Sequence, residues 1–526
     1  MVIQSKGHRD KQQSSPPELT YLWYKNMSEL TERLQQQLIA GATRPLMQDA
    51  NQHWYTGSEL NLEENVWKNY WQNKGIGHND IVLISLTNSV TYTLAVQSLW
   101  EVGAIVQPIN PATNEIQISE LEDQYHYSAI ILDSNLTDLE ILNDLFTNQP
   151  RLTTLHEPEV QIYLRDEHNT HLPEVPNDEQ IALIMHTSGT TGKPKRVGLT
   201  HHQLLAAAFN VIDSEELTDE DSTFILMPMF HINAMVISNL ATRLSHGQLL
   251  FRPKFSAHLF WKEVSSEKVT WVSLTPAIVA ILLQRDERPQ ENQLRFLRTA
   301  SAPLLPSIHQ QFNQRFSVPL IESYGMTEAA SQIAQNPLEH PVKNSVGIVK
   351  GIQIRILDGD HQVVGPDEIG EIALKGDNVI THYLDPQPEA FHNGWLLTGD
   401  LGSLDEQGYL HMAGRIKEMI IRGGENVNPL AVEDVLHDLK FISEIAVIGT
   451  PDLIYGETVT AVVVPKKLSH DHRHQLALLN ELANEQLLPV ERPSKYIFST
   501  QLPKNATGKI QRTLLAQEVT QQLKEA

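Results

Sequence analysis

Short apolar runs alternate with amphipathic stretches along roughly the first two thirds of the chain. The apolar runs predict strands at Ile81–Leu86, Ala104–Pro108, Ile130–Leu132 and Ile181–His186. Between the first two strands, the amphipathic stretch Thr91–Trp100 predicts a helix. Strand, helix, strand repetition of this kind indicates layered α/β packing around largely parallel sheets.

The pattern changes twice towards the C-terminus. Between residues 350 and 412, brief β-type runs with close turn signals, such as Ile352–Leu357 and Gly370–Leu374, predict a small β-rich subdomain. After Lys417 the pattern returns to mixed helices and strands, with helices predicted at Val432–Leu436 and Gln475–Gln486 and strands at Glu444–Ile448 and Val459–Val464. We therefore predict an α/β protein with a large N-terminal domain at 18–416, which includes the β-rich subdomain, and a small mobile α+β domain at 417–526.

Charge and hydropathy exclude several classes of partner. The chain has 526 residues, with 40 Lys plus Arg against 64 Asp plus Glu, so its formal net charge is −24. Such a charge repels nucleic acid backbones and anionic lipid, so no nucleic acid partner is expected. Residues 1–17 are polar and predict a disordered tail without the apolar core of a signal peptide. No run is long and apolar enough for a membrane span, so a cytoplasmic location is expected.

The absence of cysteine limits the chemistry. Without a thiol of its own, the chain can form no disulfide and no acyl-cysteine intermediate. Any thioester that it makes therefore requires a thiol from another molecule.

The segment 186–201, with the sequence HTSGTTGKPKRVGLTH, is the most informative part of the chain. It follows an apolar run and precedes an Ala/Leu-rich stretch, which predicts a strand, a Gly-rich loop and a helix that begins at Thr200 with a capping box to Gln203. Its hydroxyls, exposed backbone N–H groups and lysines are suited to a polyphosphate. Because the spacing from Gly189 to Lys193 is wrong and Pro194 replaces a magnesium-binding hydroxyl, it is not a Walker A loop.

This segment resembles the phosphate-loop signature of the adenylate-forming superfamily, which includes acyl-CoA synthetases, adenylation domains of peptide synthetases and luciferases. Segments that resemble the other signatures follow in the expected order: TASAPL (299–304), SYGMTEA (323–329), LTGDL (397–401), IIRGGENVNP (420–429) and PKNATGKIQR (503–512). Together they extend over roughly residues 50–515. Taken singly, each has an ordinary structural explanation, such as a polar turn, a helix start or a solvated lysine near a terminus.

The resemblance implies a set of residues that bind ATP and AMP. In these roles it places Thr187, Ser188, Gly189, Thr190, Thr191, Gly192, Lys193, Ala300, Ser301, Tyr324, Thr327, Asp400, Arg415 and Lys509. Asp400 would accept the ribose hydroxyls, Arg415 would complete that site, and Glu328 would bind Mg²⁺. The catalytic residues that it implies are Lys509, Thr327, Glu328 and His231.

The resemblance also implies a hinge, a coenzyme A tunnel and an acyl pocket. The hinge falls at Lys417, and the tunnel wall falls at Gly423, Gly424 and Glu425. The acyl pocket would be lined by His231, Asn233, Met235, Val236 and Gly325, although a packed core histidine is an equally ordinary role for His231.

Two positions depart from the pattern of the superfamily. The segment 326–337 is similar to the oxalate–CoA ligase branch, but Ser331 stands where that branch has His. Arg196 stands where the superfamily usually has Gly, which predicts a stiffer phosphate loop or extra charge beside the phosphates.

The function implied is ATP-dependent activation of a carboxylic acid, with Mg²⁺, to an acyl adenylate, followed by acyl transfer to the thiol of coenzyme A. The acid itself stays open, with a small or medium monocarboxylate favoured. Two other functions stay open as well: a stand-alone adenylation enzyme that loads a carrier protein in trans, and a non-catalytic nucleotide-binding protein. The sequence does not indicate an oligomeric state.

Overall fold

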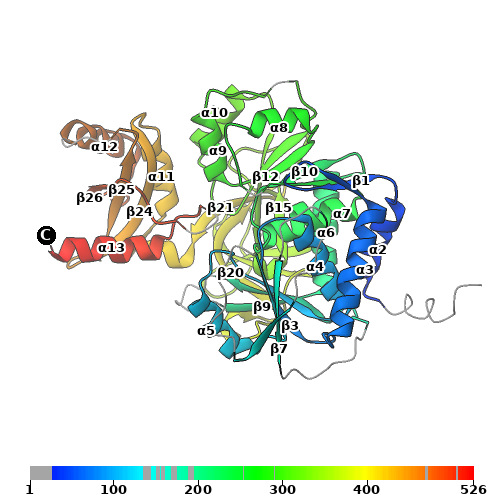
Figure 1. Ribbon diagram of the computed structural model, residues 1–526. Coiled ribbons are helices and arrows are strands. Elements are labelled where there is room, and N and C mark those ends of the chain that lie inside the picture. Colours follow the sequence, from blue (N-terminus) through cyan, green and yellow to red (C-terminus); the bar gives the residue numbers. More distant parts are fainter. Residues whose placement is uncertain are drawn as a thin grey trace, which may run out of the picture.

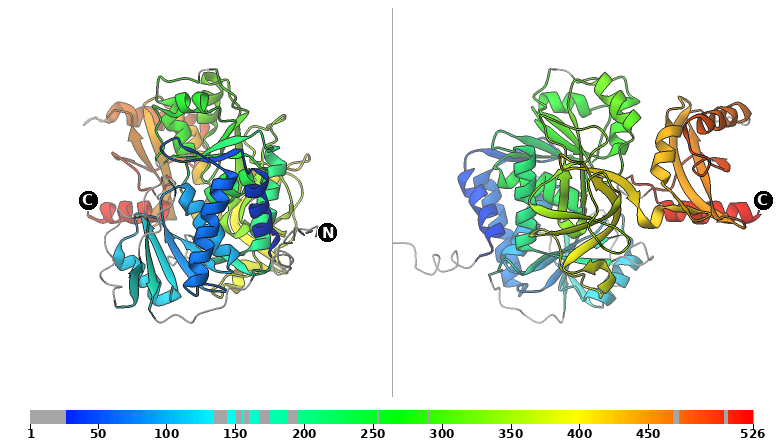
Figure 2. Two further views of the ribbon diagram at one scale, coloured as in Figure 1. Left: turned by 45° about the vertical axis from the view of Figure 1, so that its right-hand side comes forward. Right: turned by 180° about the vertical axis from the view of Figure 1, so that it is seen from behind.

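The computed structural model describes residues 27–133, 144–149, 155, 160–166, 175–187, 195–252, 254–289, 291–467, 472–504 and 508–525. A large body is formed by the chain up to about Arg415, and a smaller domain lies beside it (Figure 1). Seen from behind, the small domain is joined to the body by a narrow connection (Figure 2). The predicted division into a large α/β domain and a small C-terminal domain therefore describes this architecture.

One sheet of the body contains most of the strands predicted near the N-terminus. Its order in the described chain is β6 (Phe146–Gln149), β7 (Val160–Arg165), β5 (Ala129–Asp133), β3 (Ile81–Ser85), β4 (Ile105–Pro108), β8 (Ile181–Thr187) and β9 (Lys195–Thr200). Strands β3, β4, β5 and β8 are parallel, whereas β6, β7 and β9 are antiparallel to their neighbours. The central strands are buried, which explains why they read as continuous apolar runs.

The second sheet of the body joins a parallel half to an antiparallel half. Its order is β17 (Ile352–Leu357), β18 (Gly370–Gly376), β20 (Trp395–Leu404), β21 (Tyr409–Arg415), β16 (Gly347–Val349), β15 (Ser331–Gln335), β14 (Leu320–Met326), β13 (Phe296–Thr299), β12 (Trp271–Leu274), β10 (Ser222–Ile225), β11 (Gln248–Phe251), β1 (Pro45–Gln48) and β2 (Trp54–Thr56), with β19 (Phe391–His392) beside β20. The pairing is parallel from β1 to β14, except at β2, and antiparallel from β14 to β17. The predicted β-rich region is thus continuous with the α/β sheet through β14 and β15.

Helices cover the sheets of the body. They are α2 (Glu29–Ala40), α3 (Gly57–Asn73), α4 (Val90–Glu101), α5 (Glu115–Tyr125), α6 (His201–Glu215), α7 (Thr242–Leu244), α8 (Phe260–Ser266), α9 (Pro276–Leu283) and α10 (Pro306–Arg315), with short 3-10 turns η3 (Thr327–Ala329) and η4 (Pro388–Ala390). The predicted capping box at the start of α6 is confirmed, because the Thr200 hydroxyl and the Gln203 side chain each bond the other's backbone N–H. The segment Asn233–Ala241 (η2) is a π-helix, which the sequence did not predict.

The C-terminal domain packs helices on both faces of its own sheet. The strand order is β23 (Glu425–Val427), β22 (Ile420–Arg422), β25 (Gly456–Pro465) and β24 (Ile442–Asp452), with β26 (Lys495–Phe498) beside β25. The helices are α11 (Pro429–His437), α12 (Arg473–Gln486) and α13 (Arg512–Glu525). Two apolar clusters, one with α11 and α12 and one with α13, fill this domain. The 3-10 turn η5 (Ile416–Glu418) connects it to β21.

None of the helices in the described part of the chain combines the length and apolar character needed to cross a bilayer.

Candidate active site

A hairpin formed by β8 and β9 presents the two ends of the predicted phosphate loop. Thr187 pairs with Lys195 and His186 pairs with Arg196 at the end of this hairpin. The predicted ligands Ser188, Gly189, Thr190, Thr191, Gly192 and Lys193 lie outside the described residues. Of the predicted phosphate-loop residues, the structure therefore places only Thr187.

Glu328, the predicted magnesium ligand, lies within hydrogen-bonding reach of this hairpin. Its side chain is buried on η3, where the Tyr383 hydroxyl donates to Oε1 at 2.9 Å. Burial raises the pKa of the Glu328 carboxyl, although hydrogen bonds from its own backbone and from Tyr383, the charge of Lys195 and a hydrogen bond with Thr187 oppose the rise. Mg²⁺ bound with a nucleotide is held by one or two carboxylates together with phosphate oxygens, so this single carboxylate fits such an ion.

Asp400 lies at the centre of a second group of predicted residues. It pairs with Arg415 across β20 and β21, and Nε of Arg415 lies 2.6 Å from Oδ1 of Asp400. The Tyr324 hydroxyl, from β14, donates to Oδ2 at 2.6 Å. Asp400 is almost fully buried, and such a carboxylate, held from two sides, has accepting capacity left for ribose hydroxyls.

Lys509 reaches this group from the C-terminal domain. It precedes α13, and its electrostatic neighbours include Arg415, Glu418 and Asp400. Burial, together with the positive charge of Arg415, lowers the pKa of the Lys509 ammonium. The preceding residue, Gly508, has φ +82°, and a Cβ there would lie 3.2 Å from Cβ of Ala277 on α9. The segment that contains Lys509, the predicted catalytic lysine, thus packs directly against the body.

Arg512 holds the start of α13 in place. Its guanidinium donates to both carboxylate oxygens of Glu433 on α11, at 2.5 and 2.9 Å, and Nε lies 3.2 Å from Glu418 of η5. These bonds connect α13, α11 and the segment that contains the predicted hinge, Lys417. We call Tyr324, Glu328, Asp400, Arg415 and Lys509 the nucleotide site.

The predicted acyl-pocket residues lie at and before the π-helix η2 and beside it. The Asn233 amide donates to the Ser301 hydroxyl at 3.5 Å, and Ser273 donates to Oδ1 of Asn233 at 3.1 Å. Ser301, which follows Ala300, has φ +74°. This backbone conformation is unusual for a serine, and such conformations are often found at ligand-binding sites.

The other predicted pocket residues have clear structural surroundings. Met235 and Val236 are fully buried in the main apolar core. A Cβ at Gly325 would lie 1.9 Å from the carbonyl oxygen of Ser331, so a glycine is needed for β14 and β15 to approach. Burial lowers the pKa of His231 to about 4, so the imidazole is neutral near pH 7. The pocket roles of these four residues stay predictions.

The predicted coenzyme A residues form a tight turn. Gly423 and Gly424 connect β22 to β23 with φ +63° and +89°, and Glu425 begins β23. A two-residue hairpin turn with both φ values positive favours glycine for purely conformational reasons. The tunnel assignment therefore stays a prediction.

Several residues that the sequence did not predict support these groups. Tyr383 bonds Glu328, and Ser273 and Arg298 lie behind Asn233: Nη1 of Arg298 donates to Ser273 at 3.4 Å. Arg298 is buried, and its Nε lies 3.0 Å from Glu215 of α6. Because these contacts join residues far apart in the sequence, no local motif could indicate them.

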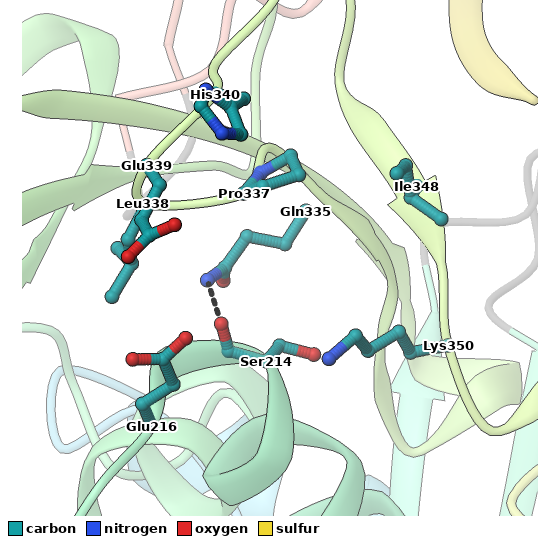
Figure 3. Close-up of a pocket in the computed structure, with 9 residues that line it drawn as sticks. All are labelled: Ser214, Glu216, Gln335, Pro337, Leu338, Glu339, His340, Ile348 and Lys350. Atoms are coloured by element: carbon teal, nitrogen blue, oxygen red, sulfur yellow. Dashed lines mark hydrogen bonds between the residues drawn. The ribbon is translucent and has the colours of Figure 1, made fainter. Parts of the chain in front are cut away.

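Gln335, which accepts a hydrogen bond from Arg298, also lines a separate hollow of about 160 Å³. Figure 3 shows Gln335 bonded to Ser214 there, with Glu216, Glu339 and Lys350 around the opening. None of the site residues predicted from the sequence lines this hollow.

The chain is similar to known enzymes over most of its length. Residues 35–384 match the family described as AMP-binding enzyme, and residues 431–509 match the AMP-binding enzyme C-terminal domain. The chain is 32% identical over 450 residues to sulfoacetate–CoA ligase of Cupriavidus necator, covering 84% of this chain and 88% of that protein. It is 32% identical over 466 residues to oxalate–CoA ligase of Arabidopsis thaliana, covering 84% and 89%. Among solved structures, ATP-bound MatB from Rhodopseudomonas palustris superposes with a TM-score of 0.81 at 25% identity, covering 93% of this chain and 99% of that one.

Proposed function

The chain belongs to the AMP-binding enzyme family, and we propose that its reaction takes place at the nucleotide site described above. It is an acid–thiol ligase that uses ATP and Mg²⁺ to convert a carboxylic acid to an acyl adenylate and then transfers the acyl group to coenzyme A. The observation that carries the residue assignment is the ion pair of Asp400 with Arg415 and the electrostatic interaction of buried Lys509 with both residues. Neither a non-catalytic protein nor a carrier-loading enzyme is supported by these relatives.

In the first half-reaction, an oxygen of the substrate carboxylate forms a bond to the α-phosphorus of ATP, and the bond from that phosphorus to pyrophosphate breaks. The Lys509 ammonium draws the carboxylate and the α-phosphate together, because it neutralises charge on both. Asp400 and Arg415 fix the ribose and therefore the position of the α-phosphate. Glu328 would hold Mg²⁺, which supplies positive charge beside the pyrophosphate oxygens.

In the second half-reaction, the sulfur of coenzyme A attacks the carbonyl carbon of the acyl adenylate, and the bond from that carbon to the AMP oxygen breaks. The chain supplies no thiol, since it contains no cysteine. In the arrangement described here Lys509 interacts electrostatically with Arg415 and Asp400, which suits adenylation. We therefore assign the exchange between half-reactions to rotation of the C-terminal domain at Lys417, which would bring Gly423, Gly424 and Glu425 to the site.

The acid that fits the acyl pocket best is short and carries a second polar or anionic group. Asn233, Ser273 and Ser301 place an amide and two hydroxyls in this region, with which a polar or anionic group of the acid could form hydrogen bonds and an alkyl chain could not. Met235 and Val236 are fully buried in the main apolar core. Sulfoacetate and oxalate, which name two of the relatives, are short acids of this kind.

A panel of acids tests the proposed function. The enzyme with ATP and Mg²⁺ is given acetate, hexanoate, palmitate, benzoate, oxalate, malonate and sulfoacetate, and pyrophosphate release is measured, followed by thioester formation with coenzyme A. We expect pyrophosphate release with a short diacid or sulfonated acid at a kcat/KM at least about tenfold above that with hexanoate. A preference for palmitate would contradict the acid class, and release of ADP and phosphate would contradict the reaction.

A further inference from the structure

Arg196, which stands where the superfamily usually has Gly, makes an ion pair with a distant part of the chain. Its Nε donates to Oδ2 of Asp385 at 2.9 Å, and Nη2 lies 2.5 Å from Oδ1. This parallel, two-bond arrangement is the most directional form of ion pair available to arginine. Because Asp385 balances its charge, Arg196 adds little net charge beside the phosphates.

The backbone joins the same two segments. The N–H of Leu384 donates to the carbonyl of Arg196 at 3.0 Å, and the Leu384 side chain lies against Gly198, where a Cβ would be 3.0 Å from Cδ2. The start of β9 is thus connected to residues 384 and 385 by both main chain and side chain.

The same guanidinium is connected to the other strand of the hairpin through Tyr125. Arg196 lies 5.4 Å from the centre of the Tyr125 ring, and the Tyr125 hydroxyl is 2.8 Å from Nε2 of His186 on β8. Burial lowers the pKa of His186, so this contact is made by a neutral imidazole near pH 7. Both strands that lead into the predicted phosphate loop are therefore anchored beside Arg196.

The segment 383–385, which Arg196 contacts, also contacts Glu328. Tyr383, next to Leu384, donates its hydroxyl to Glu328, and the Lys195 ammonium lies 4.6 Å from the centre of the Tyr383 ring. Neighbouring residues on β9, Lys195 and Arg196, thus contact neighbouring positions on one short segment. A shift of that segment would move the hairpin end and Glu328 relative to each other.

We propose that Arg196 and Asp385 form a clamp that positions the β8–β9 hairpin against Glu328 for nucleotide binding. Both are positioning residues, and neither is assigned a contact with the nucleotide. The proposal rests on the proposed function, because it assumes that ATP binds at this hairpin.

Nucleotide affinity measured without acid or coenzyme A tests the clamp. ATP with Mg²⁺ is titrated calorimetrically into the wild type, Arg196→Gly, Arg196→Lys, Asp385→Asn and the double variant Arg196→Gly with Asp385→Asn. The control is Arg44→Ala, which removes an exposed ion pair with Asp219 elsewhere on the body. The melting temperature of each variant is recorded, and the milder Arg196→Lys and Asp385→Asn keep the test valid if Arg196→Gly does not fold.

We expect Arg196→Gly and Asp385→Asn each to raise the Kd for ATP on the order of tenfold, and Arg196→Lys to raise it less. The Kd of the double variant for ATP should be no higher than that of the single variant that binds ATP more weakly, because the two residues act as one unit. In turnover, the KM for ATP should rise while the KM for coenzyme A stays unchanged, a separation that general destabilisation would not produce.

Four results would overturn the clamp. The first is a Kd for ATP in Arg196→Gly equal to that of the wild type and of Arg44→Ala. The second is a loss of binding free energy in the double variant equal to the sum of the losses in the two single variants. Tighter ATP binding by Asp385→Asn would show instead that Asp385 restrains an arginine that binds phosphate directly. A wild type that binds no ATP would overturn the proposed function together with the clamp, whereas normal binding by the wild type and by Arg196→Gly would overturn the clamp alone.

Discussion

The Tyr324 hydroxyl lies 2.6 Å from Oδ2 of Asp400 and donates a hydrogen bond to it. Burial, reinforced by the negative charge of Asp400, raises the pKa of Tyr324, so the phenol is protonated and can donate near neutral pH. With Arg415 on its other oxygen, this carboxylate is oriented before a nucleotide arrives. If the ribose binds at Asp400 as proposed, this preorganisation means that little reorganisation would accompany binding.

Asp400→Asn should weaken ATP binding through the ribose. Replacing a buried carboxylate that accepts hydroxyl groups removes charge-assisted hydrogen bonds, so the KM for ATP should rise by roughly 10 to 100-fold. The wild type should prefer ATP to 2′-deoxy-ATP, and the variant should lose most of that preference. Steady-state kinetics with both nucleotides measure this, with the exposed turn residue Asp360→Asn as control. An undiminished preference in Asp400→Asn would place the ribose elsewhere.

Lys509→Ala should separate the two half-reactions. Loss of the ammonium should slow acyl adenylate formation by at least about 100-fold, whereas thioester formation from supplied acyl adenylate should fall by less than about tenfold. Rapid-quench assays of each half-reaction give the two rates. Lys504→Ala is a matched control, because Lys504 lies on the same segment but pairs with Glu444 at 2.7 Å. Equal losses in both half-reactions would contradict the assignment of Lys509 to adenylation.

Tyr383→Phe should shift the acidic limb of the pH profile. Burial raises the pKa of Glu328, and the hydrogen bond from Tyr383 opposes that rise. Since Mg²⁺ requires the carboxylate, activity should fall, as the pH is lowered, at a pH above the usual value of about 4.3 for glutamate. Removing the hydroxyl raises the pKa further, so the limb should move to higher pH.

The profile of kcat/KM for MgATP measures this shift, with Tyr496→Phe in the C-terminal domain as control. An acidic limb at the same pH in Tyr383→Phe and the wild type would show that Glu328 does not govern it.

Glu215→Ala should destabilise the body of the protein. Glu215 and Arg298 are a fully buried ion pair, and removing one partner leaves an uncompensated charge in the interior. The free energy of unfolding should fall by about 3–5 kcal/mol. Denaturant unfolding checks this, and Lys350→Ala, which breaks an exposed pair with Asp213, should change it by less than about 1 kcal/mol. Similar losses in both variants would contradict the role of burial.

Local sequence pattern predicted the parts of the fold in which burial repeats regularly. The strands β3 and β8, the helix α4 and the start of α6 at Thr200 all lie where apolar periodicity and capping chemistry indicated them. The π-helix η2 was not predicted, because every residue from Asn233 to Ala241 is buried, so no alternation of buried and exposed positions distinguishes it from a strand or an ordinary helix.

The site was predictable only where a motif carries its own chemistry. Asp400, Arg415 and Lys509 were singled out from short segments, and the structure brings them together. The supporting residues Tyr383, Asp385 and Arg298 were not predicted, because their roles depend on partners tens to hundreds of positions away. For Arg196 the sequence indicated a departure, and the contact with Asp385 supplies its physical explanation.

The fate of oxygen tests the central claim most directly. The enzyme is given ATP, Mg²⁺, coenzyme A and its acid labelled with ¹⁸O in both carboxylate oxygens. The isotopic masses of AMP and pyrophosphate are then measured by mass spectrometry. If the carboxylate attacks the α-phosphorus, each AMP carries one ¹⁸O and the pyrophosphate carries none. Label in pyrophosphate or in inorganic phosphate, with unlabelled AMP, would contradict acyl adenylate formation.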